Sequence, residues 1–190
     1  GVCTSLRDLV RWVGGFVDAF PPRDEPEGPH PLSRATRREM QQIQFAIPSW
    51  VEPGAPDELP DVRSGGYGFG LFIADDLRHG RIVSHSGGYP GFGSNMRWQP
   101  SSGLGVIALI NHRYGPATAL GRELMSAMLD ASPGVAAPRR IGPAGQAAAG
   151  APPALLRRHL TPEQLLAGGV HEVAQGLLGF ARCQVRVFRR

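Results

Sequence analysis

The run His85-Ser86-Gly87-Gly88 brings together residue types that acyl-transfer chemistry uses. An imidazole can donate a hydrogen bond to a carboxylate or polarise an acyl oxygen. A strand without side chains lets an extended substrate lie against its edge, and a free backbone amide there can point at a developing oxyanion. The run is therefore a candidate for one wall of an active-site cleft.

A glycine-rich hairpin explains the same run without any chemistry. His85 would then only cap a strand, since short glycine motifs are common and unspecific. Local sequence favours this interpretation, so the choice depends on the segments that surround the run.

The remaining histidines and the cysteines support other chemistry less well. His79 falls in an expected hairpin turn and His112 follows an expected strand. Metal binding by these two with His85 is disfavoured because no HxH or HExxH spacing occurs. Cys3 and Cys183 lie at opposite ends of the chain without a CxxC pair, which argues against structural zinc or a disulfide. We expect no metal and no organic cofactor.

Three segments have the pattern of helices. Thr4–Phe20 has apolar residues in one stripe at helical period. Ser5 with Asp8 three residues later fits a capping box, although Thr4 could equally be the cap. Ser33–Gln44 predicts a mostly polar surface helix capped by Ser33. Pro116–Leu129 predicts a helix with a second apolar stripe.

Four strands are expected between the second and third helices. Short turns join them, which indicates antiparallel pairing and an α+β fold. We expect a sheet flanked by the N- and C-terminal helices, both on one face, as an incomplete domain. Pro48–Gly66 is expected to be loop, and Gly87–Gly93 to be too glycine-rich for a regular strand. The predicted strands are Tyr67–Ile73, Arg81–Ser86, Ser94–Gln99 and Leu104–Ile110.

Composition divides the chain near residue 130. Residues 1–130 hold 12 Arg and 14 acidic residues, whereas residues 131–190 hold 8 Arg and 2 acidic residues. We expect residues 1–130 to form the folded domain, 131–153 an Ala/Pro/Gly linker, and 154–190 a basic tail of unknown structure. Within that tail, Cys183–Phe188 alternates like a strand. Arginine in such a segment more often reflects compositional bias than nucleic-acid binding, so no nucleic-acid partner is expected.

Six short segments follow one another in a specific order within residues 1–130. They are Thr4–Trp12, Tyr67–Gly70, His85–Gly87, Gly88–Ser94, Pro100 and Ile107–Asn111. This order resembles the C-terminal part of the serine β-lactamase and penicillin-binding-protein superfamily, in particular its class C-like hydrolases and esterases. There a TxxDLxxW helix precedes a YGxG strand, a Lys-Thr-Gly or His-x-Gly strand, a GxxPGFxS turn and an apolar strand ending in Asn.

The resemblance implies roles at a few positions. His85, Ser86 and Gly87 match the third motif, which lines the cleft opposite the nucleophile, with Ser86 and Gly87 contacting substrate. Gly88 matches the position whose backbone N–H completes the oxyanion hole. His-Ser-Gly in place of Lys-Thr-Gly occurs in relatives that act on esters or peptides, which disfavours β-lactam hydrolysis. Three further residues are expected at or under the rim of the cleft, without an assigned role: Tyr89, Phe92 and Asn95.

Two motifs of that family are missing from this sequence. The nucleophile motif needs Ser and Lys three residues apart, and the chain contains no lysine, since all 20 of its Lys+Arg residues are Arg. Neither Tyr-x-Asn nor Ser-x-Asn occurs. Both motifs lie upstream of the matched part in the family, and the chain begins at Gly1 rather than Met. We therefore expect an interior piece of a longer enzyme.

The sequence thus predicts the C-terminal part of a serine hydrolase that cleaves an ester, amide or lactam through an acyl-serine intermediate. This chain alone is expected to be inactive. The expected partner is a small-molecule or peptide-like acyl substrate. A non-catalytic binding module with the same groove is the alternative, and an unrelated α+β interaction domain is a third. No run of about 18 apolar residues is present, and with no export segment a cytoplasmic location is favoured.

Overall fold

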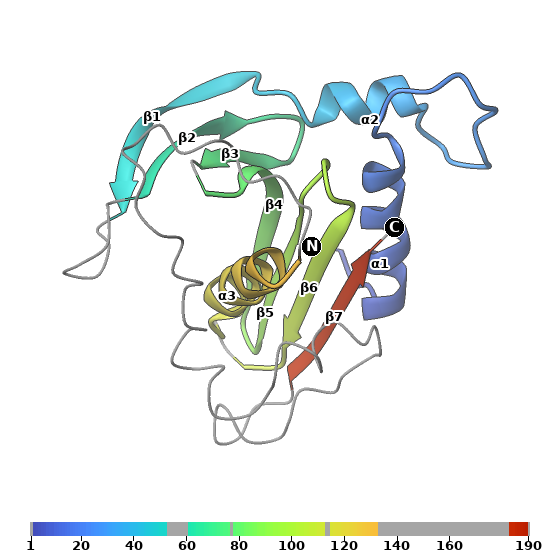
Figure 1. The fold of residues 1–190 in the computed structure, drawn as a ribbon. Coiled ribbons are helices and arrows are strands. Elements are labelled where there is room, and N and C mark those ends of the chain that lie inside the picture. Colours follow the sequence, from blue (N-terminus) through green and yellow to red (C-terminus); the bar gives the residue numbers. More distant parts are fainter. Residues whose placement is uncertain (1, 53–60, 77, 113–114, 133–182, 190) are drawn as a thin grey trace.

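The computed structural model describes residues 2–52, 61–76, 78–112, 115–132 and 183–189. Over these residues the chain forms one seven-stranded sheet and three helices (Figure 1). The strands lie in chain order and each neighbouring pair is antiparallel, which confirms the α+β class. The strands are β1 (Phe45–Glu52), β2 (Asp61–Tyr67), β3 (Phe72–Asp76), β4 (Gly80–Tyr89), β5 (Phe92–Trp98), β6 (Leu104–Ile110) and β7 (Cys183–Arg189).

The three helices are α1 (Leu6–Asp18), α2 (Arg34–Met40) and α3 (Ala117–Asp130). Ser5, rather than Thr4, caps α1, and the predicted Ser33 cap of α2 is confirmed. The Ser5 and Ser33 side chains accept hydrogen bonds from the amides of Asp8 and Thr36. Each cap satisfies one of the amides that the first helical turn leaves without a partner.

Helices α1 and α3 lie on opposite faces of the sheet, so the prediction of a common face was wrong (Figure 1). The cause lies in β6, which is apolar on both faces. Ile107 packs with the α1 cluster, while Val106 packs with the α3 cluster. A central strand with two apolar faces needs cover on both sides.

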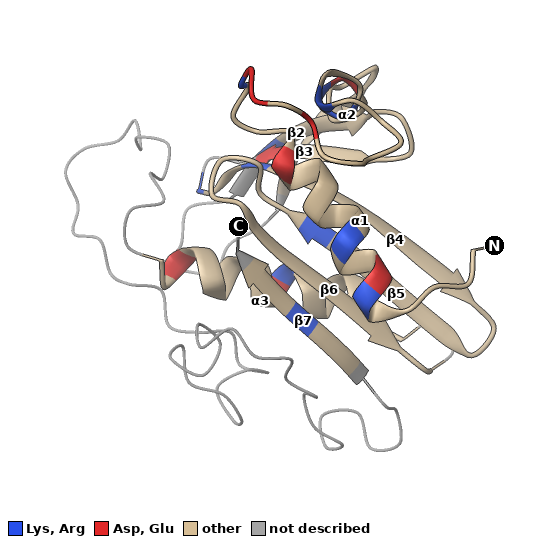
Figure 2. Ribbon diagram, turned by 90° about the vertical axis from the view of Figure 1, so that its right-hand side faces the viewer, with Lys and Arg blue, Asp and Glu red and all other residues tan. Residues whose placement is uncertain are grey.

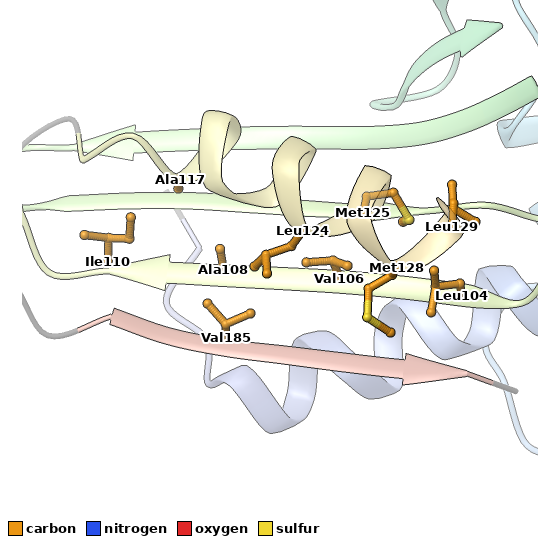
Figure 3. Packing of buried hydrophobic residues seen from close by; sticks show 10 residues of the cluster. All are labelled: Leu104, Val106, Ala108, Ile110, Ala117, Leu124, Met125, Met128, Leu129 and Val185. Atoms are coloured by element: carbon orange, nitrogen blue, oxygen red, sulfur yellow. The ribbon is translucent and has the colours of Figure 1, made fainter. Parts of the chain in front are cut away.

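The α3 side of the sheet holds one of the two hydrophobic cores (Figure 3). Residues at every second position of β6 meet the inward stripe of α3, as alternation along a strand requires. Val185 of β7 extends this core. Its buried members are Leu104, Val106, Ala108, Ile110, Ala117, Leu124, Met125, Met128, Leu129 and Val185.

The second core lies beneath α1 and extends toward α2. Its buried members are Val13, Phe16, Val17, Leu71, Ile73, Val83, Trp98 and Ile107. The Trp98 indole N–H donates to Gln41 Oε1 at 2.8 Å. Helix α2 was predicted to lie on the surface, but Arg34 and Arg37 are buried. Burial is possible because Arg37 donates to the Gly15 carbonyl and both arginines lie beside Asp18.

Two strand predictions were wrong for the same physical reason. The expected loop Pro48–Gly66 contains most of the paired strands β1 and β2, and the expected irregular segment Gly87–Gly93 continues β4 to Tyr89. Glycine and proline lower local strand preference, yet pairing with a neighbouring strand overrides it. The predicted strand Tyr67–Ile73 is also interrupted, because Gly70 has φ +73° in a turn between β2 and β3.

Strand β7 places the end of the chain in the same sheet. The predicted strand over Cys183–Phe188 is confirmed, and it pairs with the full length of β6. The sequence predicted this strand but not that it would pair with β6 in the same sheet. Most of the predicted linker and the start of the tail lie outside the described residues, so the division into domains stays a prediction.

Charged residues are unevenly distributed over the described part of the chain (Figure 2). Both signs occur on α1, whereas β6 carries no charge. No described helix is long and apolar enough to cross a membrane.

Candidate active-site edge

The last five residues of β4 form an edge that no strand of the described residues pairs with on one side. Strand β3 pairs with Gly80–Ser84 only, while β5 pairs with β4 as far as Tyr89. Among the described residues, no strand therefore covers the outer edge of residues 85–89. Residues 86–90 are exposed. An extended peptide-like chain could add to such an edge through main-chain hydrogen bonds.

The hairpin between β4 and β5 determines which backbone groups point toward that edge. Its loop is Pro90-Gly91, with Gly91 at φ +90° and Tyr89 opposite Phe92. In a two-residue hairpin the closing pair exchanges both hydrogen bonds, and such pairs then alternate along the strands. The N–H groups of Ser86 and Gly88 consequently point away from β5. The amide predicted to face an oxyanion thus lies on the uncovered side.

His85 lies on the α1 face of the sheet. It is two residues from Val83, which is in the α1 core, and it pairs with Met96, which packs against the same core. Gly87 shares this face, and a Cβ there would come within 2.7 Å of Ser94 Oγ. The imidazole is half-buried rather than enclosed. Ser86 and Gly88 belong to the opposite face, so the His85 and Ser86 side chains lie on opposite faces of the sheet and only the backbone lies along the edge.

Tyr67, predicted to begin a strand, contacts this imidazole. Tyr67 Oη lies 2.9 Å from His85 Nε2, and the two rings meet edge to face with centroids 6.1 Å apart. Tyr67 ends β2, eighteen residues before His85. Both residues occurred in the family-like segments, but nothing in their spacing indicated contact.

Asn95 supports the histidine strand from the α3 face. It is 2 % exposed, and its Nδ2 donates to the His85 carbonyl at 3.4 Å while its Oδ1 accepts from Arg97 Nε at 2.9 Å. Gly121 of α3 lies directly above, where a Cβ would clash with Asn95 Oδ1. The prediction of a position under the cleft is compatible with this placement.

Three charged side chains of the described residues have pKa values shifted from their ordinary ones. Burial, and then the charges of Arg122 and Arg63, lowers the pKa of Arg97 to about 10. A hydrogen bond with Asp75 raises the pKa of Arg81, and burial raises the pKa of Glu123. Arg81 makes two 2.9 Å contacts with Asp75, so this aspartate has a structural partner.

The other residues considered at the sequence level lie away from β4's uncovered edge. His79 Nε2 lies 3.0 Å from Asp130 Oδ1 at the end of α3, while His112 and Cys3 are exposed. Within the described ranges, no three His, Cys, Asp or Glu side chains are grouped as for a metal ion. A surface hollow near the start of α3 includes none of the predicted site residues. Its lining is Gly115, Pro116, Thr118, Ala119, Arg122 and Glu123.

Two exposed aromatic residues mark the tip of the β4–β5 hairpin. Tyr89 and Phe92 pair across the strands and are 69 % and 59 % exposed. They project from the same face as His85, since strand alternation places residues 85, 87 and 89 together. The predicted rim position of these two residues stays a prediction.

Comparison with protein-family models gives a match over most of the described sheet and helices. The sequence model of the family described as Beta-lactamase matches residues 1–127, which is two thirds of the chain and ends within α3. Searches of curated proteins and of solved structures found no match.

Proposed function

Because the chain belongs to the Beta-lactamase family, we propose that it is the C-terminal part of a serine hydrolase that acts on an ester, amide or lactam. The single observation that supports this most directly is the uncovered edge of β4 beyond Ser84. An acyl substrate would lie along it, with its carbonyl oxygen toward the Gly88 amide. His85 would contact the acyl group or a carboxylate, and Ser86 and Gly87 would line the binding edge.

The proposed reaction has two steps. A serine hydroxyl attacks the acyl carbon, the oxyanion forms, and the alcohol or amine leaves with a proton, giving an acyl-serine. Water then attacks the acyl-serine, releasing the acid and restoring the serine. The residues in this chain bind and stabilise the oxyanion. The serine and its activating lysine must come from elsewhere, because the sequence contains no lysine.

Two measurements test this proposal. The 190-residue chain is expected not to react with a fluorophosphonate probe, because it has no Ser-x-x-Lys. A longer chain from the same reading frame, carrying Ser-x-x-Lys and Tyr-x-Asn upstream, is expected to react at that serine. Labelling of the 190-residue chain, or the absence of both motifs upstream, would contradict the proposal.

A non-catalytic binding module is the second candidate. It is favoured by the same absence of lysine, since the uncovered edge can bind an extended ligand without cleaving it. A reading frame without the two upstream motifs, together with perturbation of the Gly88 amide resonance by an acylated peptide, would support this candidate over the hydrolase.

A further inference from the structure

Arg97 is a buried cation without an acidic partner in the part of the chain that the structure describes. It lies on β5, pairs with Val106, and shares the α3 face of the sheet. The residue is 7 % exposed. Its single hydrogen bond to the described residues runs from Nε to Asn95 Oδ1, a neutral acceptor. Burial of a charge is costly unless an opposite charge or several hydrogen bonds compensate.

The other two buried arginines of this fold do have such partners. Arg34 and Arg37, which are 6 % and 2 % exposed, lie within 3.7 Å of Asp18, and Arg37 is at the same distance from Glu27. Both also donate to backbone carbonyls. Arg97 has neither a carboxylate nor a carbonyl partner of this kind among the described residues.

The two charged groups that lower the pKa of Arg97 within the described residues are both positive. Arg122 on α3 and Arg63 on β2 both lower its pKa, after the larger effect of burial. With a pKa of about 10, the guanidinium stays charged at neutral pH. The two arginines belong to two other elements, β2 and α3, and Arg122 also lines the hollow near the start of α3.

The terminal nitrogens of the Arg97 guanidinium are not fully enclosed, although the residue as a whole is only 7 % exposed. The fully enclosed side-chain atoms without a hydrogen-bond partner are Arg34 Nε and Gln99 Oε1, within the described residues. The Nη1 and Nη2 atoms of Arg97 are not among them, although no described residue accepts from them. Two planar donors in this arrangement match two oxygens of one carboxylate or phosphate.

We propose that Arg97, with Arg122 and Arg63 around it, binds a small oxyanion on the α3 face of the sheet. The ligand class is a carboxylate or phosphate whose oxygens accept from Nη1 and Nη2 of Arg97. Asn95 holds Nε and so fixes the direction of the guanidinium. This site lies on the face opposite the His85 side chain, and its existence does not depend on the proposed hydrolase activity.

The test is a titration of the 190-residue chain with inorganic phosphate and, separately, with acetate, at constant ionic strength set by sodium chloride. The resonance of Arg97 Nε–H is followed by NMR and the melting temperature is measured in parallel. A saturable shift of that resonance and a rising melting temperature are expected. The anion that saturates at the lower concentration identifies the preferred class.

Matched variants make the result specific. Arg97→Met should abolish the rise in melting temperature, while Arg11→Met, on the exposed side of α1, should retain both this rise and the shift of the Arg97 resonance. If Arg97→Met fails to fold, Arg122→Gln provides the second test, with an expected several-fold rise in the half-saturating concentration. The proposal would be overturned if the Arg97 resonance did not move, or if phosphate and acetate raised the melting temperature no more than chloride does. It would also be overturned if the melting temperature of Arg97→Met or Arg122→Gln rose as much as that of the parent.

Discussion

The phenolic oxygen of Tyr67 lies 2.9 Å from Nε2 of His85, which joins the end of β2 to the uncovered part of β4. One ring nitrogen is therefore engaged by protein. The other, Nδ1, has no hydrogen-bond partner among the described residues and is the nitrogen available to a ligand. A hydrogen bond at one nitrogen selects the tautomer at the other. Tyr67 thus acts as a positioning residue for the imidazole in the proposed function.

Substituting Tyr67→Phe should release the His85 ring while leaving the ring contact largely intact. The loss of one side-chain hydrogen bond should lower the free energy of unfolding by about 1 kcal/mol. The ¹⁵N shifts of His85 should move toward those of a solvent-exposed mixture of tautomers. Tyr89→Phe, at an exposed tyrosine on the same strand as His85, is the control and should leave these shifts unchanged. Identical His85 shifts in Tyr67→Phe and the parent chain would contradict the positioning role.

In a longer chain that carries the nucleophile, His85→Ala should reduce kcat/KM by about 10²-fold, the usual size of an acid–base or polarising contribution. Its free energy of unfolding should change by no more than about 1 kcal/mol, because the side chain is half-buried and makes one hydrogen bond. Steady-state kinetics with an aryl ester and urea denaturation provide the two measurements.

His79→Ala serves as the control for that experiment, since His79 contacts Asp130 away from β4's uncovered edge. It should keep the parent kcat/KM. If His85→Ala instead lost several kcal/mol of stability and kept its activity per folded molecule, His85 would have only a structural role.

Val185→Asp tests whether β7 belongs to the folded sheet. Val185 is buried in the core beneath α3, so an unpaired carboxylate there should lower the free energy of unfolding by about 3 kcal/mol. Gln184→Asp, at the exposed neighbouring position, should change it by less than about 0.5 kcal/mol. Urea denaturation measures both, and equal effects would show that β7 does not pack in solution.

The pKa of Arg97 predicts how stability depends on pH. Because the folded-state pKa of Arg97 is about 10, well below the ordinary value of an arginine, the unfolded chain holds this proton more tightly than the folded one. The charge therefore opposes folding at neutral pH, by up to about 3 kcal/mol. Arg97→Met removes that cost but leaves Asn95 Oδ1 without its donor, so a net stabilisation of about 1 to 2 kcal/mol is expected without added oxyanion.

The extra stability of Arg97→Met over the parent should shrink as pH rises through about 10. Above this pH the folded parent loses the Arg97 proton while the unfolded chain keeps it, so the free energy of unfolding of the parent rises. Urea denaturation over this alkaline range, with Arg11→Met as the control for an exposed arginine, measures the change. An advantage of Arg97→Met that stays constant across this range would show that the charge of Arg97 does not oppose folding.

Periodicity predicted those elements whose own residues define a buried face. The stripe of α1, its Ser5 cap and the two-sided apolar strand β6 were all confirmed. Strands β1 and β2 were missed because Pro48 and the pair Gly65-Gly66 weaken the local pattern, and only pairing with each other and with β3 stabilises them. For the same reason β4 continues through glycines that were expected to end it.

What the sequence by itself determined is chemical: the His-Ser-Gly-Gly run, the absence of lysine, and the ordered segments that match the Beta-lactamase family. Residue types are properties of the chain before it folds. The tertiary structure alone decided that Tyr67 reaches His85 and that β7 pairs with β6. It also decided that, within the described residues, β4 has an uncovered edge and the buried Arg97 has no acidic partner. These contacts join residues far apart in sequence through strand register, and register follows from packing of the whole sheet rather than from any local pattern.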